Sequence, residues 1–151
     1  MSRSSSKAMQ VAGAAAFLWA GAVIGGSLIA APAKFQVADL TLPVALQVGQ
    51  VTFRYLGFFE LAPAIVMCLA LAVSFKSRSA RWRFLLLPVL ALLLFAVQWF
   101  GVMPLLTERT NAIISGETVS SSHLHLVYVI LEIAKVAVLL TTGFFELYVE
   151  T

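Results

Sequence analysis

The sequence predicts an all-α fold, a four-helix transmembrane bundle with both termini cytoplasmic. Of its 151 residues, 61% are hydrophobic and only 11% are charged, whereas typical soluble proteins carry roughly 25% charged residues. Four apolar stretches also reach the roughly 20 residues that a helix needs to cross the hydrocarbon core of a membrane, about 30 Å thick. They lie at residues 8–31, 52–75, 84–105 and 122–145. We therefore expect a single integral membrane domain over residues 1–151.

The first span begins with basic residues and ends in "APA", and so imitates a secretory signal with its cleavage site. Its apolar part is about twice the length of a signal core, which has about 7–15 residues, so we predict a retained helix. Gly21 and Gly25 form a GxxxG pair in this span. Such small residues let another backbone approach closely. Helix packing within one bundle is the preferred interpretation of the pair, and a dimer face is the alternative.

The second span is preceded by a connection, residues 33–51, that contains a helix-start pattern. Thr41 is a suitable N-cap residue, and Pro43 would lie in the first turn of a helix that begins there. The pattern fits a short interfacial helix or the start of the second span, and the sequence does not separate the two.

The third span follows the most basic connection of the chain, "KSRSARWR". Lys and Arg in short flanking segments are retained on the cytoplasmic side of a membrane. Arg3 and Lys7 precede the first span, whereas the other two connections contribute only Lys34 and Arg109. We therefore expect a multi-pass membrane protein with a cytoplasmic N-terminus and C-terminus. The basic residues of the connection are Lys76, Arg78, Arg81 and Arg83.

The fourth span, "HLHLVYVILEIAKVAVLL", is apolar but holds Glu132 and Lys135 near its middle. At roughly 100° per residue, His125, Tyr128 and these two charged residues share one sector of the helix. A central charged residue costs about 2.5 to 3.5 kcal/mol on insertion, while each Leu or Ile returns only about 0.3 to 0.6 kcal/mol. The sector should therefore face protein or a water-filled cavity.

Partners for this sector lie at similar depth in other spans. At about 1.5 Å per residue, Glu60, Gln98 and Glu132 each lie roughly 11 to 15 Å from the outer boundary. Arg54 enters from the outer end of the second span, within reach of His125. We therefore predict one buried polar network. Its members are Arg54, Glu60, Gln98, His125, Tyr128, Glu132 and Lys135.

Two interpretations of this network remain open. It can hold the helices in one register, where hydrophobicity does not distinguish a helix from lipid. Alternatively, the carboxylate pair can relay protons or coordinate a cation or a polar substrate.

Signatures of cofactor and catalytic chemistry are weak in this sequence. The rings of His123 and His125 diverge on one helix and have no further His or Cys beside them, so we predict no metal site and no cofactor. A haem with two axial histidines would need one from each of two facing helices. The sequence also lacks a glycine-rich phosphate loop, a nucleophile elbow and a CxxC pair. We therefore predict no catalytic residues and no enzymatic activity.

Four motifs resemble those of a known group of membrane proteins. "GSLIAAPAKF", "VTFRYLGFFE", "PLLTERTNAIISGE" and "SSSHLHLVYVILEIAKVAVLL" are similar to segments of bacterial members of the transmembrane-protein-205-like superfamily. The resemblance spans residues 17–140 and implies a small four-helix membrane protein of undetermined biochemical role. It implies no catalytic residues. The charged face of the fourth span is richer than that of a generic member, which leaves open a specialised branch. The family-like positions are Pro32, Phe35, Phe53, Arg54, Pro104, Arg109, His125, Glu132 and Lys135.

These observations favour a small transport or membrane-stress component with Glu60, Glu132 and Lys135 as its polar centre. The expected partners are the lipid bilayer and either further copies of the chain or other subunits of a membrane complex, but no nucleic acid. The alternative is a structural or interaction subunit whose charges only fix packing. A membrane redox protein that binds haem or quinone near His125 is a third, less favoured class.

Overall fold

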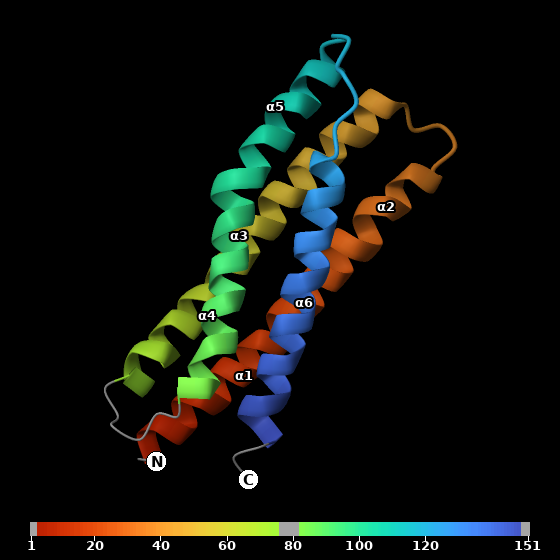
Figure 1. The fold of residues 1–151 in the computed structure, drawn as a ribbon. Helices are drawn as coiled ribbons and strands as arrows, with labels where there is room; N and C mark the ends of the chain where they lie inside the picture. The colour runs from red at the N-terminus through yellow and green to blue at the C-terminus, as the bar shows by residue number, and fades with distance from the viewer. Residues whose placement is uncertain (1–2, 76–81, 149–151) are drawn as a thin grey trace.

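The computed structural model describes residues 3–75 and 82–148, and this part of the chain is helical and contains no strand. Four of its helices are long and apolar enough to cross a membrane, which confirms the predicted all-α fold. They run along one another, and α1 begins at the same end of the bundle at which α6 ends (Figure 1). We call the opposite end, where α3 begins and α5 ends, the distal end. The basic connection at residues 76–81 lies outside the described residues.

The first long helix contains a widened turn. It consists of α1 (Arg3–Val23), the π-helical η1 (Ile24–Ala30), α2 (Ala31–Ala33) and the short η2 (Lys34–Gln36). The N–H of Ala31 bonds to the carbonyl of Gly26, five residues back. Pro32 explains this geometry, because it has no N–H and its ring clashes with the carbonyl four residues earlier.

The second long helix, α3 (Leu42–Phe75), begins well before the predicted boundary at residue 52. The N–H of Ala45 bonds to the carbonyl of Thr41 at 2.9 Å, and Pro43 lies in the first turn. Proline is well tolerated there because the first N–H groups of a helix have no partner within it. The segment left open by the sequence is therefore the start of the second helix and not a separate element.

The third long helix consists of α4 (Trp82–Ala96), the π-helical η3 (Val97–Val102) and α5 (Met103–Ile114). It repeats the proline pattern, since the N–H of Met103 bonds to the carbonyl of Gln98 and Pro104 follows. The helix continues past the predicted end at residue 105 because no Gly or Pro interrupts it until Gly116. Gly116 adopts a φ of 83° and ends the helix.

The fourth long helix, α6 (Leu124–Tyr148), begins close to the predicted position. The Ser122 hydroxyl accepts a hydrogen bond from the N–H of Leu124 at 3.1 Å, which satisfies one of the free donors of the first turn.

At the distal end, α3 and α5 are joined by polar side chains. Gln50 Nε2 donates to Asn111 Oδ1 at 2.8 Å and lies 3.5 Å from the Thr107 carbonyl. Arg109 donates to the carbonyl of Ser120 and so holds the chain that leads into α6. Residues 106–114 of the predicted connection are therefore an extension of the third helix, and residues 115–123 form the loop into α6.

The core forms where α1 packs between α3 and α6, with α4 packed on α6. Trp19, Met67 and Leu139 are fully buried there. The alanines of α1 that lie four residues apart are also buried, so their small side chains allow close approach of the neighbouring helices. These are Ala12, Ala16 and Ala20.

Gly21 and Gly25 do not take part in this packing. Both are exposed, and a Cβ atom added to either would meet no described atom within 4 Å. The interpretation that the pair packs within the bundle is therefore wrong. The reason is angular: the alanine row occupies the packed face of α1, and Gly21 is turned about 100° from Ala20.

Candidate functional site

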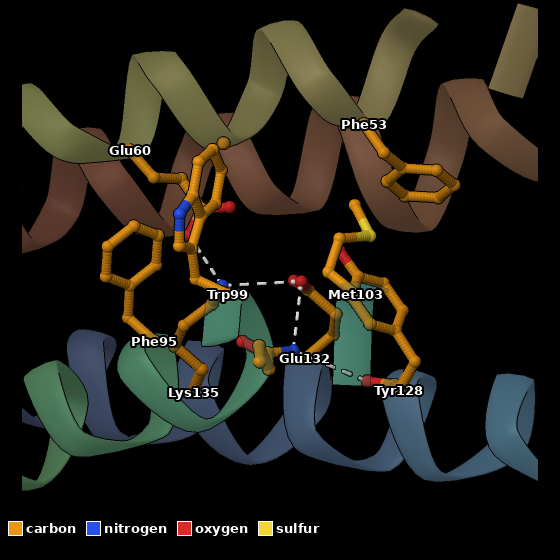
Figure 2. Close-up of a pocket in the computed structure, with 10 residues that line it drawn as sticks. Phe53, Glu60, Phe95, Trp99, Met103, Tyr128, Glu132 and Lys135 are labelled. Atoms are coloured by element: carbon orange, nitrogen blue, oxygen red, sulfur yellow. Dashed lines mark hydrogen bonds and ion pairs between the residues drawn. The ribbon is translucent and has the colours of Figure 1, made fainter. Parts of the chain in front are cut away.

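Lys135 occupies the centre of a buried ion network in the middle of the bundle (Figure 2). Its Nζ lies 2.5 Å from Glu60 Oε2 on α3 and 3.3 Å from Glu132 Oε1, one turn away on α6. All three residues are at most 3% exposed. The ammonium also lies 5.7 Å from the centre of the Phe95 ring, within cation–π range. The charged sector of the fourth span therefore faces protein.

Trp19 joins the network from α1. Its Nε1 donates to Glu60 Oε2 at 2.6 Å, so this one oxygen accepts hydrogen bonds from two helices. The sequence prediction missed Trp19 because it paired only ionisable and amide side chains. A signal was present, since a buried indole N–H usually finds an acceptor and Trp19 lies in the middle of the first span.

Gln98 connects the third long helix to α6. Its Nε2 donates to Glu132 Oε1 at 3.1 Å and lies 3.5 Å from the Tyr128 carbonyl. Gln98 belongs to η3, so the widened turn before Pro104 is the backbone that presents this amide. Tyr128 is 5% exposed, and its ring packs edge-on against Phe53. The structure thus brings together Glu60, Gln98, Tyr128, Glu132 and Lys135.

Arg54 and His125 are not members of this network. Both side chains are exposed, and neither shares in the hydrogen bonds and ion pairs that join the other predicted residues. The angular position of His125 was a poor guide because depth also matters, and Arg54 was placed only by its reach toward His125. At about 1.5 Å per residue, His125 lies roughly 10 Å from Glu132 along α6, at the start of the helix. The residue on which the redox alternative depended is therefore exposed.

The network has more carboxylates than cations. Its two carboxylates face one ammonium, so it carries one surplus negative charge when all three groups are ionised. Glu132 Oε2 and Gln98 Oε1 are buried and have no hydrogen-bond partner, although the Tyr128 hydroxyl lies close enough to interact with the Glu132 carboxyl group. An unsatisfied buried acceptor is costly, and more so on a charged group. When all three groups are ionised, one carboxylate of the network therefore has no cation of its own.

A small cavity lies beside these oxygens. Its volume is about 10 Å³, which is room for about one water molecule. Trp99 packs over it, and this is possible because the neighbouring position on α3 is Gly57, where any Cβ atom would collide with the indole ring. The lining residues are Phe53, Gly57, Glu60, Phe95, Gln98, Trp99, Met103, Tyr128, Glu132 and Lys135.

Within residues 3–75 and 82–148, no group of three or more His, Cys, Asp or Glu side chains is placed to hold a metal ion. Comparison of the chain with protein-family models, curated proteins and solved structures found no match. The resemblance of the motifs to the transmembrane-protein-205-like superfamily stays a prediction.

Proposed function

We propose that the chain is a small transport component of a bacterial inner membrane. Glu60, Glu132 and Lys135 form the centre through which a proton or a small cation passes. The four apolar helices are long enough to cross the membrane, and the network lies in their middle region. Ionisable groups in that position are expensive, and they are kept mainly where they bind or relay charge.

The observation that carries this proposal is the surplus carboxylate. A network that served packing alone would be expected to satisfy all of its members, because a partly satisfied buried network is less stable than an apolar one. Here Glu132 Oε2 lacks a donor and lies at a cavity. A mobile positive charge at this carboxylate would neutralise the surplus negative charge of the network.

The size of the cavity bears on how transport would occur. Space for about one water molecule excludes a large polar substrate in the described conformation but admits a proton or a dehydrated ion. Because four helices barely enclose a pathway, the proposal includes an oligomer as the working form, with both termini of each copy in the cytoplasm.

Ion flux in proteoliposomes tests the proposal. We expect Glu60→Gln and Glu132→Gln to abolish proton- or cation-dependent flux, because each removes one carboxylate from the centre. The matched control is Glu108→Gln, which changes an exposed carboxylate on α5. Flux that continues unchanged in both buried variants, with the protein still folded, would refute the transport role.

The second candidate is a structural or interaction subunit of a larger membrane complex. One observation favours it: the network ties α1, α3, α6 and the third long helix together through Glu60 and Glu132. In that case Glu60→Gln and Glu132→Gln lower the thermal stability of the protein and leave any ion flux of the complex unaltered. The protein would also co-purify with a partner in fixed stoichiometry.

A further inference from the structure

We propose that the two carboxyl groups of the network have different roles, with Glu132 binding the proton and Glu60 remaining ionised as the counter-ion of Lys135. In this arrangement the proton resides on Glu132 Oε2, beside Gln98 and the cavity. The inference rests on the proposed function, since it names the ion that the same site takes and the group that takes it.

The hydrogen bonds of Glu60 favour its ionised form. Its Oε2 accepts from the Lys135 ammonium at 2.5 Å and from the Trp19 indole at 2.6 Å. Hydrogen bonds donated to a carboxylate stabilise the charged state, and the short ones to a cation do so most strongly. A proton on Glu60 would weaken both contacts.

Glu132 is held more loosely. Its ammonium contact is longer, 3.3 Å, and its second donor is the neutral amide of Gln98 at 3.1 Å. Both bonds end on Oε1, whereas Oε2 has no hydrogen-bond partner; the Tyr128 hydroxyl is a further donor near this carboxyl group. A proton on Oε2 therefore leaves the existing hydrogen bonds in place.

The protonated group also has an acceptor to meet. Gln98 Oε1 is buried at the same cavity and no described group donates to it. A protonated carboxyl carries one O–H donor. That donor can satisfy Gln98 Oε1 directly or through one water molecule, for which the cavity has room. When a hydronium ion delivers its proton to Oε2, water is left and the network changes from one surplus negative charge to neutrality.

A metal cation fits these features less well than a proton. Hard divalent cations take six or more oxygen ligands, whereas this cavity admits about one water molecule and presents two oxygens that lack donors. The Lys135 ammonium beside Glu132 would also repel a second cation. The titratable groups that face Glu132 are Glu60 from α3, with Tyr128 and Lys135 from α6 itself. The described residues of the first and third long helices that face the network are neutral, namely Trp19, Phe95 and Gln98.

The experiment is a pH titration by infrared spectroscopy of the purified full chain in lipid. We expect the C=O band of a protonated carboxylic acid, which disappears as the pH is raised. Glu132→Gln removes this band at every pH. Glu60→Gln keeps it at low pH but moves its disappearance to lower pH, because the surplus negative charge is gone. Glu108→Gln serves as the exposed control. Glu146 is also buried, so the band is assigned from differences between variants.

A titrating band that survives in Glu132→Gln, or one that only Glu60→Gln abolishes, would overturn the assignment. So would a parent protein with no titrating acid band.

A second variant keeps the test decisive if Glu132→Gln does not fold. Gln98→Leu removes the acceptor that faces Glu132, so the acid C=O band should move to a higher wavenumber. An unmoved band in a folded Gln98→Leu protein would contradict the proposed geometry.

These spectra separate this inference from the transport proposal. If the infrared spectra behave as expected but the proteoliposomes show no ion flux, the proton site on Glu132 is supported and the transport role is refuted. Flux that depends on both carboxylates, together with an acid band that belongs to Glu60, would support the transport role and overturn the assignment of the proton to Glu132.

Discussion

At the scale of single residues, the Glu60 carboxylate is the point at which three helices meet. Trp19, Lys135 and Glu60 itself come from α1, α6 and α3, and one oxygen accepts both hydrogen bonds. Apolar packing alone does not fix the relative position of helices in a membrane, because lipid is as apolar as their side chains. A shared acceptor of this kind supplies a directional constraint instead.

The contribution of the indole can be measured with Trp19→Phe, which removes the donor and keeps an aromatic ring. We expect a loss of about 1.5 to 3 kcal/mol in the free energy of unfolding, the range for a hydrogen bond to a charged group. The measurement is equilibrium unfolding in detergent, with Glu60→Leu, which removes the acceptor, as the background for a double-mutant cycle. Equal losses in both backgrounds would show that the indole does not act through Glu60.

Sequence reasoning predicted part of this site. The helical angle grouped Tyr128, Glu132 and Lys135 correctly, because that angle is set by the backbone alone. The same angle placed His125 wrongly, because membership also needs the right depth. Arg54, assigned by its reach from the outer end of the second span, was wrong because helix rotation is fixed only by packing. Trp19 was missed because a neutral side chain carries no energetic warning in an apolar span. The unsatisfied oxygens of Gln98 and Glu132 depend on side-chain positions that only the folded structure provides.

At the scale of elements, two glycines show which helix faces are packed. Gly57 on α3 lies against the Trp99 ring of η3, whereas Gly21 on α1 faces open space. We therefore expect substitution of glycine by alanine to lower the stability of the protein at position 57 and not at position 21.

Gly57→Ala should destabilise the protein by about 1 to 3 kcal/mol, because the added methyl group must displace a packed indole. Gly21→Ala is the matched control and should be neutral or stabilising by about 0.5 to 1 kcal/mol, since alanine is the better helix former. Thermal unfolding of both variants in the same detergent gives the comparison. A Gly57→Ala protein as stable as the parent would mean that the indole has another place to pack.

The helix boundaries show what hydropathy does and does not measure. The existence of the four helices was predicted correctly, because about 20 apolar residues are required to cross the membrane. The distal ends of the second and third helices were not, since a helix can continue through polar residues beyond the apolar span. Thus α3 begins at Leu42 and α5 ends at Ile114. The two π turns were also missed, although Pro32 and Pro104 mark both of them.

At the scale of the whole molecule, α1 begins and α6 ends on one side of the bundle (Figure 1). An even number of crossings requires this, and the Lys and Arg distribution predicts that this side is cytoplasmic. In this orientation the proposed proton site would lie between two aqueous phases, as the proposed transport requires.

Reporter fusions test the orientation. A fusion at Ser77 should report the cytoplasm, because its segment carries the most basic connection of the sequence. One at Asn111, near the end of α5, should report the opposite side. Alkaline phosphatase and green fluorescent protein give complementary signals for the two locations. Exchange of the two results would reverse the predicted topology.

The distal extension has a mechanical consequence. With 34 residues at about 1.5 Å each, α3 is about 50 Å long, which exceeds a hydrocarbon core of about 30 Å by some 20 Å. Clamped to α5 by Gln50 and Asn111, this excess forms a stiff two-helix post. A molecule that approaches from the far aqueous phase would therefore first meet the loops at residues 37–41 and 115–123, which cap these two helices at the distal end (Figure 1).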